Sequence, residues 1–256
     1  MYLVLPYLLI ILQLILAIFV WLKPTKAIMV AGSFLMGVGC LYLTGFVATS
    51  SWVLSPKVLL YLIVGAVQIS YVVMVLFNRG ESWRIAALSQ PLILPFVVLA
   101  GVFPVMGVGP VFMIGSSSMQ WHVVSATLAY ALLTMAAYYG VAVIARQTTL
   151  KAHDHSPFVA RLPSLEVLDK AQHSTLLFAL AALMVSVVAG SFYTHETHDV
   201  WFLLEGKTTL SVITLVLLLT LLIGKKVCGV RGRQSAKFVL LVYVLVMALF
   251  GLSVFL

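Results

Sequence analysis

The sequence is poor in charged residues, and this scarcity excludes most soluble folds. Only 9% of the 256 residues are Asp, Glu, Lys or Arg, whereas 63% are hydrophobic. A soluble domain averages roughly 25% charged residues, so this chain has too few polar side chains to cover a core. Apolar runs of about 20 residues recur along its whole length, and each is long enough to cross a bilayer as a helix. We therefore predict an all-α polytopic membrane protein, with one integral membrane domain over residues 1–256 and no soluble domain.

Cysteine and membrane-embedded acids are also scarce. Cys40 lies inside an apolar run and Cys228 in a basic segment, so we expect no disulfide between them. No Asp or Glu lies deep in any apolar run, which argues against a carrier that uses a membrane carboxylate. Gln68 and Ser70 are expected to form hydrogen bonds between helices. The sequence has no phosphate loop and no nucleophile–histidine–acid arrangement, and we expect no enzymatic activity.

The basic residues predict how the chain crosses the membrane. Of the 15 Lys and Arg residues, 13 lie in alternate connections between apolar runs. Because basic connections stay on the cytoplasmic side, both termini are predicted on the outer side of a bacterial inner (plasma) membrane. The same rule accounts for the net charge of +8 without a nucleic-acid partner. No basic residue precedes the first run, so no cleavable signal is expected. The eight predicted spans are about 2–22, 27–48, 56–77, 85–106, 119–145, 169–193, 208–224 and 237–256.

One short segment, Ser191 to Trp201, concentrates ionisable side chains. It reads SFYTHETHDVW and follows a long, almost wholly apolar run. We predict that it lies on the outer face as a loop after the sixth span. His195 and His198 in this loop suit solvated side chains, or a zinc or copper site with Glu196, although such a site would lack a fourth ligand.

Three stretches of the sequence resemble the cytochrome c assembly family, which holds the heme ligation proteins of the two-component pathway and smaller HemX-like relatives. The segment LPSLEVLD, 162–169, resembles the family's entrance to a long helix, and Gly190 and Phe192 match the end of that helix. The segment HVVSATLAY places His122 where the family has a histidine at the outer start of a helix, and Tyr130 follows eight residues later. The basic segment KKVCGVRGRQSAK resembles the loop before the family's last span.

The resemblance covers about residues 119–240 and implies a membrane protein that handles heme. It departs from the full-length ligation proteins, because THETHDVWFLLEGK replaces their tryptophan-rich external loop and only Trp201 and Lys207 echo it. The sequence also has no histidine after His198, whereas the family has histidines in its last two helices. His122 is therefore the one ligand that the resemblance transfers, and the chain is similar to the short, HemX-like branch.

Heme b is the cofactor that the resemblance implies, and the helix positions limit which histidines could share one iron. His122 lies near the outer end of its span and His173 near the inner end of the next, so we expect a depth difference of about 25 Å or more. His195 and His198 lie on the outer side with His122. The predicted site thus pairs His122 with His195 or His198, with Lys207 and Trp201 as further propionate or loop contacts.

The histidines also have plainer interpretations. His122 and His173 suit hydrogen bonds within the bundle or at the membrane interface, and His153 and His155 suit a solvated cytoplasmic loop.

The resemblance and the residues together lead us to expect a heme-handling protein that assists cytochrome c assembly or heme homeostasis. It would hold or pass heme near the outer leaflet, and its partners would be the bilayer, heme and other cytochrome c maturation proteins. Two alternatives stay open, which are a non-heme membrane scaffold or regulator and a small-molecule carrier. A scaffold predicts that His122 can be lost without effect, and a carrier predicts substrate-dependent flux in vesicles.

Overall fold

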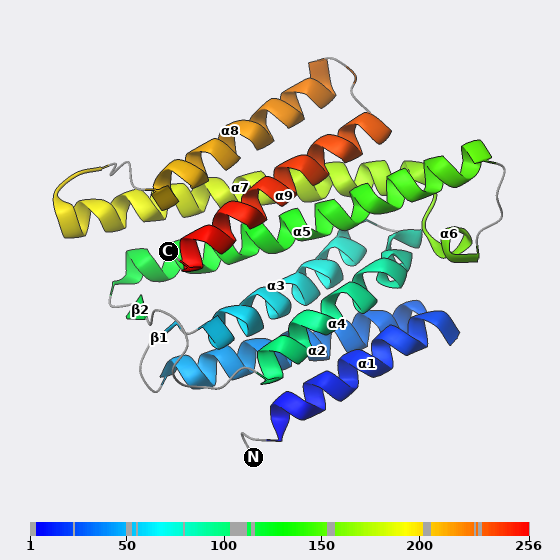
Figure 1. The fold of residues 1–256 in the computed structure, drawn as a ribbon, viewed down its shortest axis with the longest axis horizontal. Coiled ribbons are helices and arrows are strands. Elements are labelled where there is room, and N and C mark those ends of the chain that lie inside the picture. Colours follow the sequence, from blue (N-terminus) through cyan, green and yellow to red (C-terminus); the bar gives the residue numbers. More distant parts are fainter. Residues whose placement is uncertain are drawn as a thin grey trace.

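The computed structural model describes most of the chain, namely residues 4–22, 24–49, 53–54, 56–78, 80–102, 112–113, 116–152, 157–201, 206–227, 229 and 232–255. These residues form helices and one short strand pair (Figure 1). The α-helices are α1 (Leu5–Leu22), α2 (Lys26–Thr49), α3 (Pro56–Phe77), α4 (Ala86–Val102), α5 (Ser117–Ala152), α6 (Pro157–Arg161), α7 (Leu165–His198), α8 (Gly206–Val227) and α9 (Arg233–Phe255). A 3-10 helix, η1 (Glu81–Ile85), precedes α4, and β1 (Val53–Leu54) pairs antiparallel with β2 (Phe112–Met113).

A long helix occupies each of the eight predicted spans. Within the described residues, six helical segments are long and apolar enough to cross a membrane, and they correspond to the first six predicted spans. The helix entrance that the segment 162–169 suggests is confirmed, because Ser164 within it is the N-cap of α7. The sequence did not predict the short strand pair of β1 and β2. The expectation that Cys40 and Cys228 form no disulfide stays a prediction, because Cys228 lies outside the described residues. Cys40 is a buried free thiol.

The prediction that SFYTHETHDVW forms a loop is wrong for most of its length. The helix α7 does not end near residue 193 but continues through His198. The hydroxyls of Thr194 and Thr197 donate to the carbonyls of Gly190 and Tyr193, each at 2.9 Å, so these two side chains bond along the helix. The helix ends where Asp199 takes a left-handed conformation, with φ 56°, and its N–H bonds the carbonyl of His195.

The long helices form two groups of four. The helices α1, α2, α3 and α4 pack together, and α5, α7, α8 and α9 form the second group, with α3 against α5 at the junction (Figure 1). The start of α1, the strand pair, the C-terminal tip of α7 and the end of α9 all lie toward the same end of the bundle. We call this the His122 end, because α5 begins there, and the opposite end the Lys225 end.

Neutral polar side chains join the first four helices at their centre. Gln13 of α1, Ser33 of α2, Gln68 of α3 and Gln90 of α4 are all 0% exposed, and we call them the glutamine cluster. The Nε2 of Gln68 donates to the Oε1 of Gln13 at 2.8 Å, and the Nε2 of Gln13 donates to the carbonyl of Gln90 at 2.8 Å. The Nε2 of Gln90 donates to the hydroxyl of Ser33 at 3.0 Å. The predicted role of Gln68 is thus confirmed, whereas the buried hydroxyl of Ser70 has no partner among the described residues.

Charged side chains join the second group at the Lys225 end. The Nζ of Lys225 in α8 lies 3.5 Å from the Oδ1 of Asp169 in α7 and 3.4 Å from the Oε1 of Gln172. The hydroxyl of Ser235 in α9 also donates to Gln172, at 3.5 Å. The Lys225 side chain is 5% exposed and the Asp169 side chain 31% exposed. We call these four residues the Lys225 cluster, and they connect α7, α8 and α9. The carboxylate and the amide offset the cost of burying the lysine.

The short helix α6 connects the second group to the first. Arg161 donates from Nη1 to the carbonyls of Val20 and Trp21 at the end of α1, at 3.2 and 2.5 Å. Its guanidinium also lies 5.2 Å from the centre of the Trp21 ring, on which Phe158 stacks. Because the last carbonyls of a helix have no partners within the helix, Arg161 supplies donors to the C-terminal end of α1.

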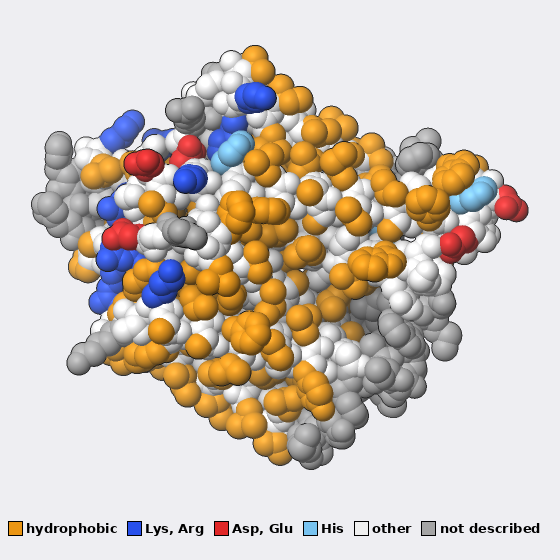
Figure 2. All heavy atoms as spheres, turned by 180° about the vertical axis from the view of Figure 1, so that it is seen from behind, with side chains coloured by type: hydrophobic (Ala, Val, Ile, Leu, Met, Phe, Trp, Pro, Cys, Tyr) orange, Lys and Arg blue, Asp and Glu red, His pale blue; other side chains and the backbone are white. Residues whose placement is uncertain are grey.

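The surface has the distribution of side chains that a membrane protein needs. Figure 2 shows Lys and Arg side chains gathered at one end of the molecule with acidic and histidine side chains among them, further acidic and histidine side chains at the tip of the other end, and apolar side chains between the two ends. Large apolar residues such as Leu76, Leu22 and Val188 are more than half exposed on the helix faces. In water such a surface would be unstable, so the fold supports a multi-pass membrane protein.

Candidate functional site

The candidate site lies where the start of α5 meets the end of α7. These are the two longest helices, with 36 and 34 residues, and they run side by side in opposite directions. The hydroxyl of Ser118 in the first turn of α5 donates to the Oε1 of Glu196 at 2.6 Å. The structure therefore places His122 of α5 and the polar tip of α7 at the same end of the bundle.

His122 is fixed by a hydrogen bond to the backbone of α7. Its Nδ1 lies 2.8 Å from the carbonyl oxygen of Ser186, and the Ser186 hydroxyl donates to the His122 carbonyl at 3.3 Å. Because a carbonyl oxygen can only accept, this contact places a proton on Nδ1, and in the neutral imidazole the lone pair is then on Nε2. This is the tautomer of a metal-ligating histidine, which usually donates its other ring N–H to a carbonyl or carboxylate.

His195 packs against an aromatic ring at the tip of α7. Its imidazole stacks on Trp201, with the ring centres 4.3 Å apart and the planes within 10° of each other. Phe192 contacts the same Trp201 ring edge to face, at 5.7 Å. The Nδ1 of His195 is buried and has no hydrogen-bond partner among the described residues. A buried imidazole nitrogen without a partner is costly.

The rings of His122 and His195 occupy different places along α7. The His122 ring lies against Ser186 and Gly190, and His195 follows Gly190 by five residues, or about 7.5 Å of helix. His198, the last residue of α7, is exposed three residues further on. The structure thus brings the three predicted ligands to one end without placing them around one point. Among the described residues, no three His, Cys, Asp or Glu side chains lie close enough together to hold a metal ion.

The remaining predicted residues are spread over the molecule. Lys207 lies in the first turn of α8, and nothing is described of its side chain. His173 lies 22 residues before His195 on α7, a separation of about 33 Å along the helix, and its charged neighbours are Lys225 and Asp169. His153 and His155 lie outside the described residues.

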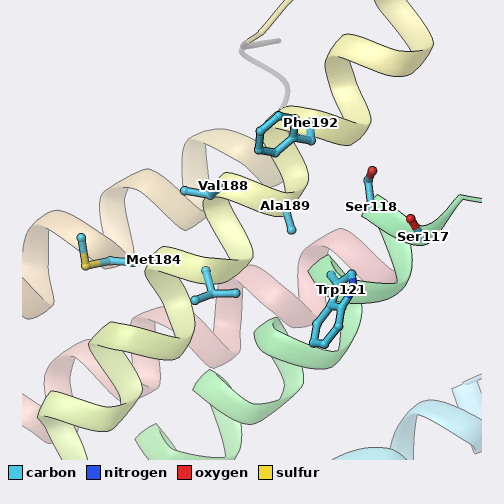
Figure 3. Close-up of a pocket in the computed structure, with 8 residues that line it drawn as sticks. Ser117, Ser118, Trp121, Met184, Val188, Ala189 and Phe192 are labelled. Carbon is cyan, nitrogen blue, oxygen red and sulfur yellow. The ribbon is translucent and has the colours of Figure 1, made fainter.

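The structure has an apolar groove next to His122 that the sequence did not predict. It has a volume of about 410 Å³ and opens between α5 and α7, beside the residue that precedes His122 (Figure 3). Met184, Val188 and Phe192 contribute from α7 at a spacing of four residues, which a search for one-sided helix faces could have found. The lining residues are Ser117, Ser118, Trp121, Met184, Val185, Val188, Ala189 and Phe192.

Comparison with known proteins supports the family resemblance. The chain is 27% identical over 215 residues to an uncharacterized 28.8 kDa protein of Azospirillum brasilense, described by its place in a nifR3-like 5′ region, and the match covers 78% of each chain. No solved structure matches the chain. The family model described as cytochrome C assembly protein matches residues 4–256, which includes the first four helices, where the sequence shows little of the motif. The chain therefore belongs to the cytochrome c assembly family.

Proposed function

We propose that this protein holds heme b at the His122 end of the bundle during cytochrome c maturation, where the Nε2 of His122 would bind the iron. The observation that carries the proposal is the hydrogen bond from His122 Nδ1 to the Ser186 carbonyl at 2.8 Å. This bond selects the tautomer that ligation requires and fixes the plane of the ring. Membership in the cytochrome c assembly family supplies the heme context, and heme iron commonly accepts imidazole as an axial ligand.

The second ligand is proposed to come from the tip of α7. His195 is the better candidate, because its buried Nδ1 has no partner among the described residues, while His198 is exposed at the helix end. Trp201 stacks on His195 and would restrict the orientation of that ring. Lys207, at the start of α8, is the cation proposed to meet a heme propionate.

The proposed topology places this site at the outer face of the inner membrane. All eight predicted spans coincide with helices, and most of the described Lys and Arg side chains gather at the opposite end, with Lys57 at the start of α3 as an exception. With basic residues inside, α1 begins and α9 ends on the outer side, as does the tip of α7. The protein would hold heme or pass it to other maturation proteins without itself making or breaking a covalent bond, and so it would not be an enzyme.

The absorption spectrum of the purified protein tests the heme proposal. We expect a Soret band and sharp α and β bands in the reduced state, and we expect His122→Ala to remove most of the heme at equal amounts of folded protein. The His173→Ala variant is the matched control, because His173 precedes Ser186, the partner of His122, by 13 residues, or about 20 Å along α7. A His122→Ala variant with unchanged heme content, or a wild-type protein that takes up no added heme, would favour the non-heme scaffold instead.

A further inference from the structure

We infer that Gly190 is a positioning residue for His122, because the missing side chain at this position gives the imidazole access to the Ser186 carbonyl. The inference depends on the proposed heme-ligand role of His122 for its functional meaning. The contact itself is a property of the helix pair α5 and α7. It can therefore be tested without heme.

The space at Gly190 is filled by the His122 ring. A Cβ built on Gly190 would lie 2.9 Å from the Nδ1 and 3.2 Å from the Cε1 of His122. Both distances are shorter than ordinary contacts between carbon and its neighbours, which are about 3.5–4.0 Å. The ring is also tied to α7 by its hydrogen bond. Any side chain at position 190 would thus push the imidazole away from Ser186.

The helix geometry explains why the glycine stands four residues after Ser186. In α7 the carbonyl of Ser186 already accepts the N–H of Gly190 within the helix. A carbonyl oxygen has two lone pairs, and the second one accepts the N–H of His122. A Cβ at position 190 would meet the imidazole, so the glycine leaves room for the ring beside the second lone pair.

Ser186 contributes mainly through its backbone. Its carbonyl lies 2.8 Å from the Nδ1 of His122, whereas its hydroxyl makes two longer contacts, at 3.2 Å to the same Nδ1 and at 3.3 Å to the His122 carbonyl. We therefore expect Ser186→Ala to keep the tautomer of His122 and Gly190→Ala to lose it. The second change adds one methyl group and raises helix propensity, so a loss would not come from a weaker helix.

Nitrogen NMR of the full-length protein in nanodiscs, with labelled histidine and no heme, tests the contact directly. The His122 signals are identified by their absence in His122→Ala. We expect a neutral ring with its proton on Nδ1 in the wild type and in Ser186→Ala, and a different or mixed tautomer in Gly190→Ala. Gly45→Ala is the matched control, because a Cβ at Gly45 meets nothing within 4 Å. An unchanged His122 tautomer in Gly190→Ala, or a wild-type ring protonated on Nε2, overturns the inference.

Heme titration of the same variants separates this inference from the proposed function. If both are right, Gly190→Ala should weaken heme binding about 10-fold or more, as the loss of partners that orient a ligand does, while Gly45→Ala should not. If the tautomer changes as expected but no variant binds heme, the positioning role of Gly190 stands and the proposed function fails. If heme binds equally to wild type and Gly190→Ala and the tautomer is unchanged, the positioning role fails and the proposed function stands.

Discussion

The first four long helices and the second group of four are both joined by buried polar side chains, but the two sets differ in charge. The glutamine cluster is neutral, fully buried and linked by short hydrogen bonds. The Lys225 cluster contains an ion pair with a longer contact, 3.5 Å, and its carboxylate is partly exposed. The second group also carries His122 and the tip of α7. Neutral amides thus join α1 to α4, which carry none of the proposed ligands. The buried ion pair of Lys225 and Asp169 joins helices of the second group, which carries them.

The largest effect is expected from removing the counter-ion of Lys225. Asp169→Ala would leave a lysine side chain that is 5% exposed without its carboxylate. Breaking a fully buried pair costs about 3–5 kcal/mol. We expect about 2–3 kcal/mol here, because Asp169 is partly exposed. The free energy of unfolding in mixed micelles measures this loss.

The matched control for Asp169→Ala is Glu166→Ala. Glu166 is an exposed carboxylate in the first turn of the same helix, and we expect a change within about 0.5 kcal/mol. Equal losses from the two substitutions would mean that the ion pair contributes no more to the free energy of unfolding than a surface charge does. The two helix groups would then differ in the residues they bury but not in how those residues stabilise them.

A smaller effect is expected from the glutamine cluster. Gln90→Leu removes the donor to Ser33 and an acceptor of Gln13 and Gln68, so we expect a loss of about 1–2 kcal/mol from polar groups left without partners. Replacing Gln13, Gln68 and Gln90 together by Leu should cost less than three times this amount, because no amide then remains to be satisfied. Additive losses in the same unfolding measurement would contradict a cooperative cluster.

The smallest effect is expected at the contact between the two groups. Arg161→Gln removes the donors to the Val20 and Trp21 carbonyls and the stacking of the guanidinium near Trp21. We expect a loss of about 1 kcal/mol, since each such contact contributes about 0.5–1.5 kcal/mol. Arg84→Gln is the control, because the guanidinium of Arg84 also lies near a tryptophan ring, 5.8 Å from the centre of Trp83, but its partner is the surface carboxylate of Glu81, at 3.3 Å, and exposed pairs contribute little.

The sequence predicts where the helices lie far better than it predicts how they meet. Apolar run length follows the thickness of a bilayer, and the capping residue Ser164 marks a helix start, so both could be read from the chain. The extension of α7 through His198 could not, because polar residues after an apolar run indicate the end of a membrane segment and not the end of a helix. Thr194 and Thr197 bond along the helix, and Asp199 ends it.

The contacts of the candidate site depend on tertiary packing. His122 could be selected from its place in the family motif, but its partner is 64 residues away, and nothing local indicates Ser186. Gly190 appears in the sequence as a motif residue, and its contact with the His122 ring becomes visible only when α5 and α7 are packed together. The stack of Trp201 on His195 depends likewise on the turn at Asp199.

The contact of Arg161 with α1 has a consequence for the order of events during synthesis. The two residues Arg161 and Trp21 are 140 positions apart in the chain. At about 5–20 residues per second, roughly 7–28 s pass between the synthesis of Trp21 and that of Arg161. During this time α1 is already long enough to enter the membrane, while the carbonyls at its C-terminal end depend on water or headgroups for hydrogen bonds. The first helix of the chain therefore reaches its final set of bonds only after five of the eight long helices have been made.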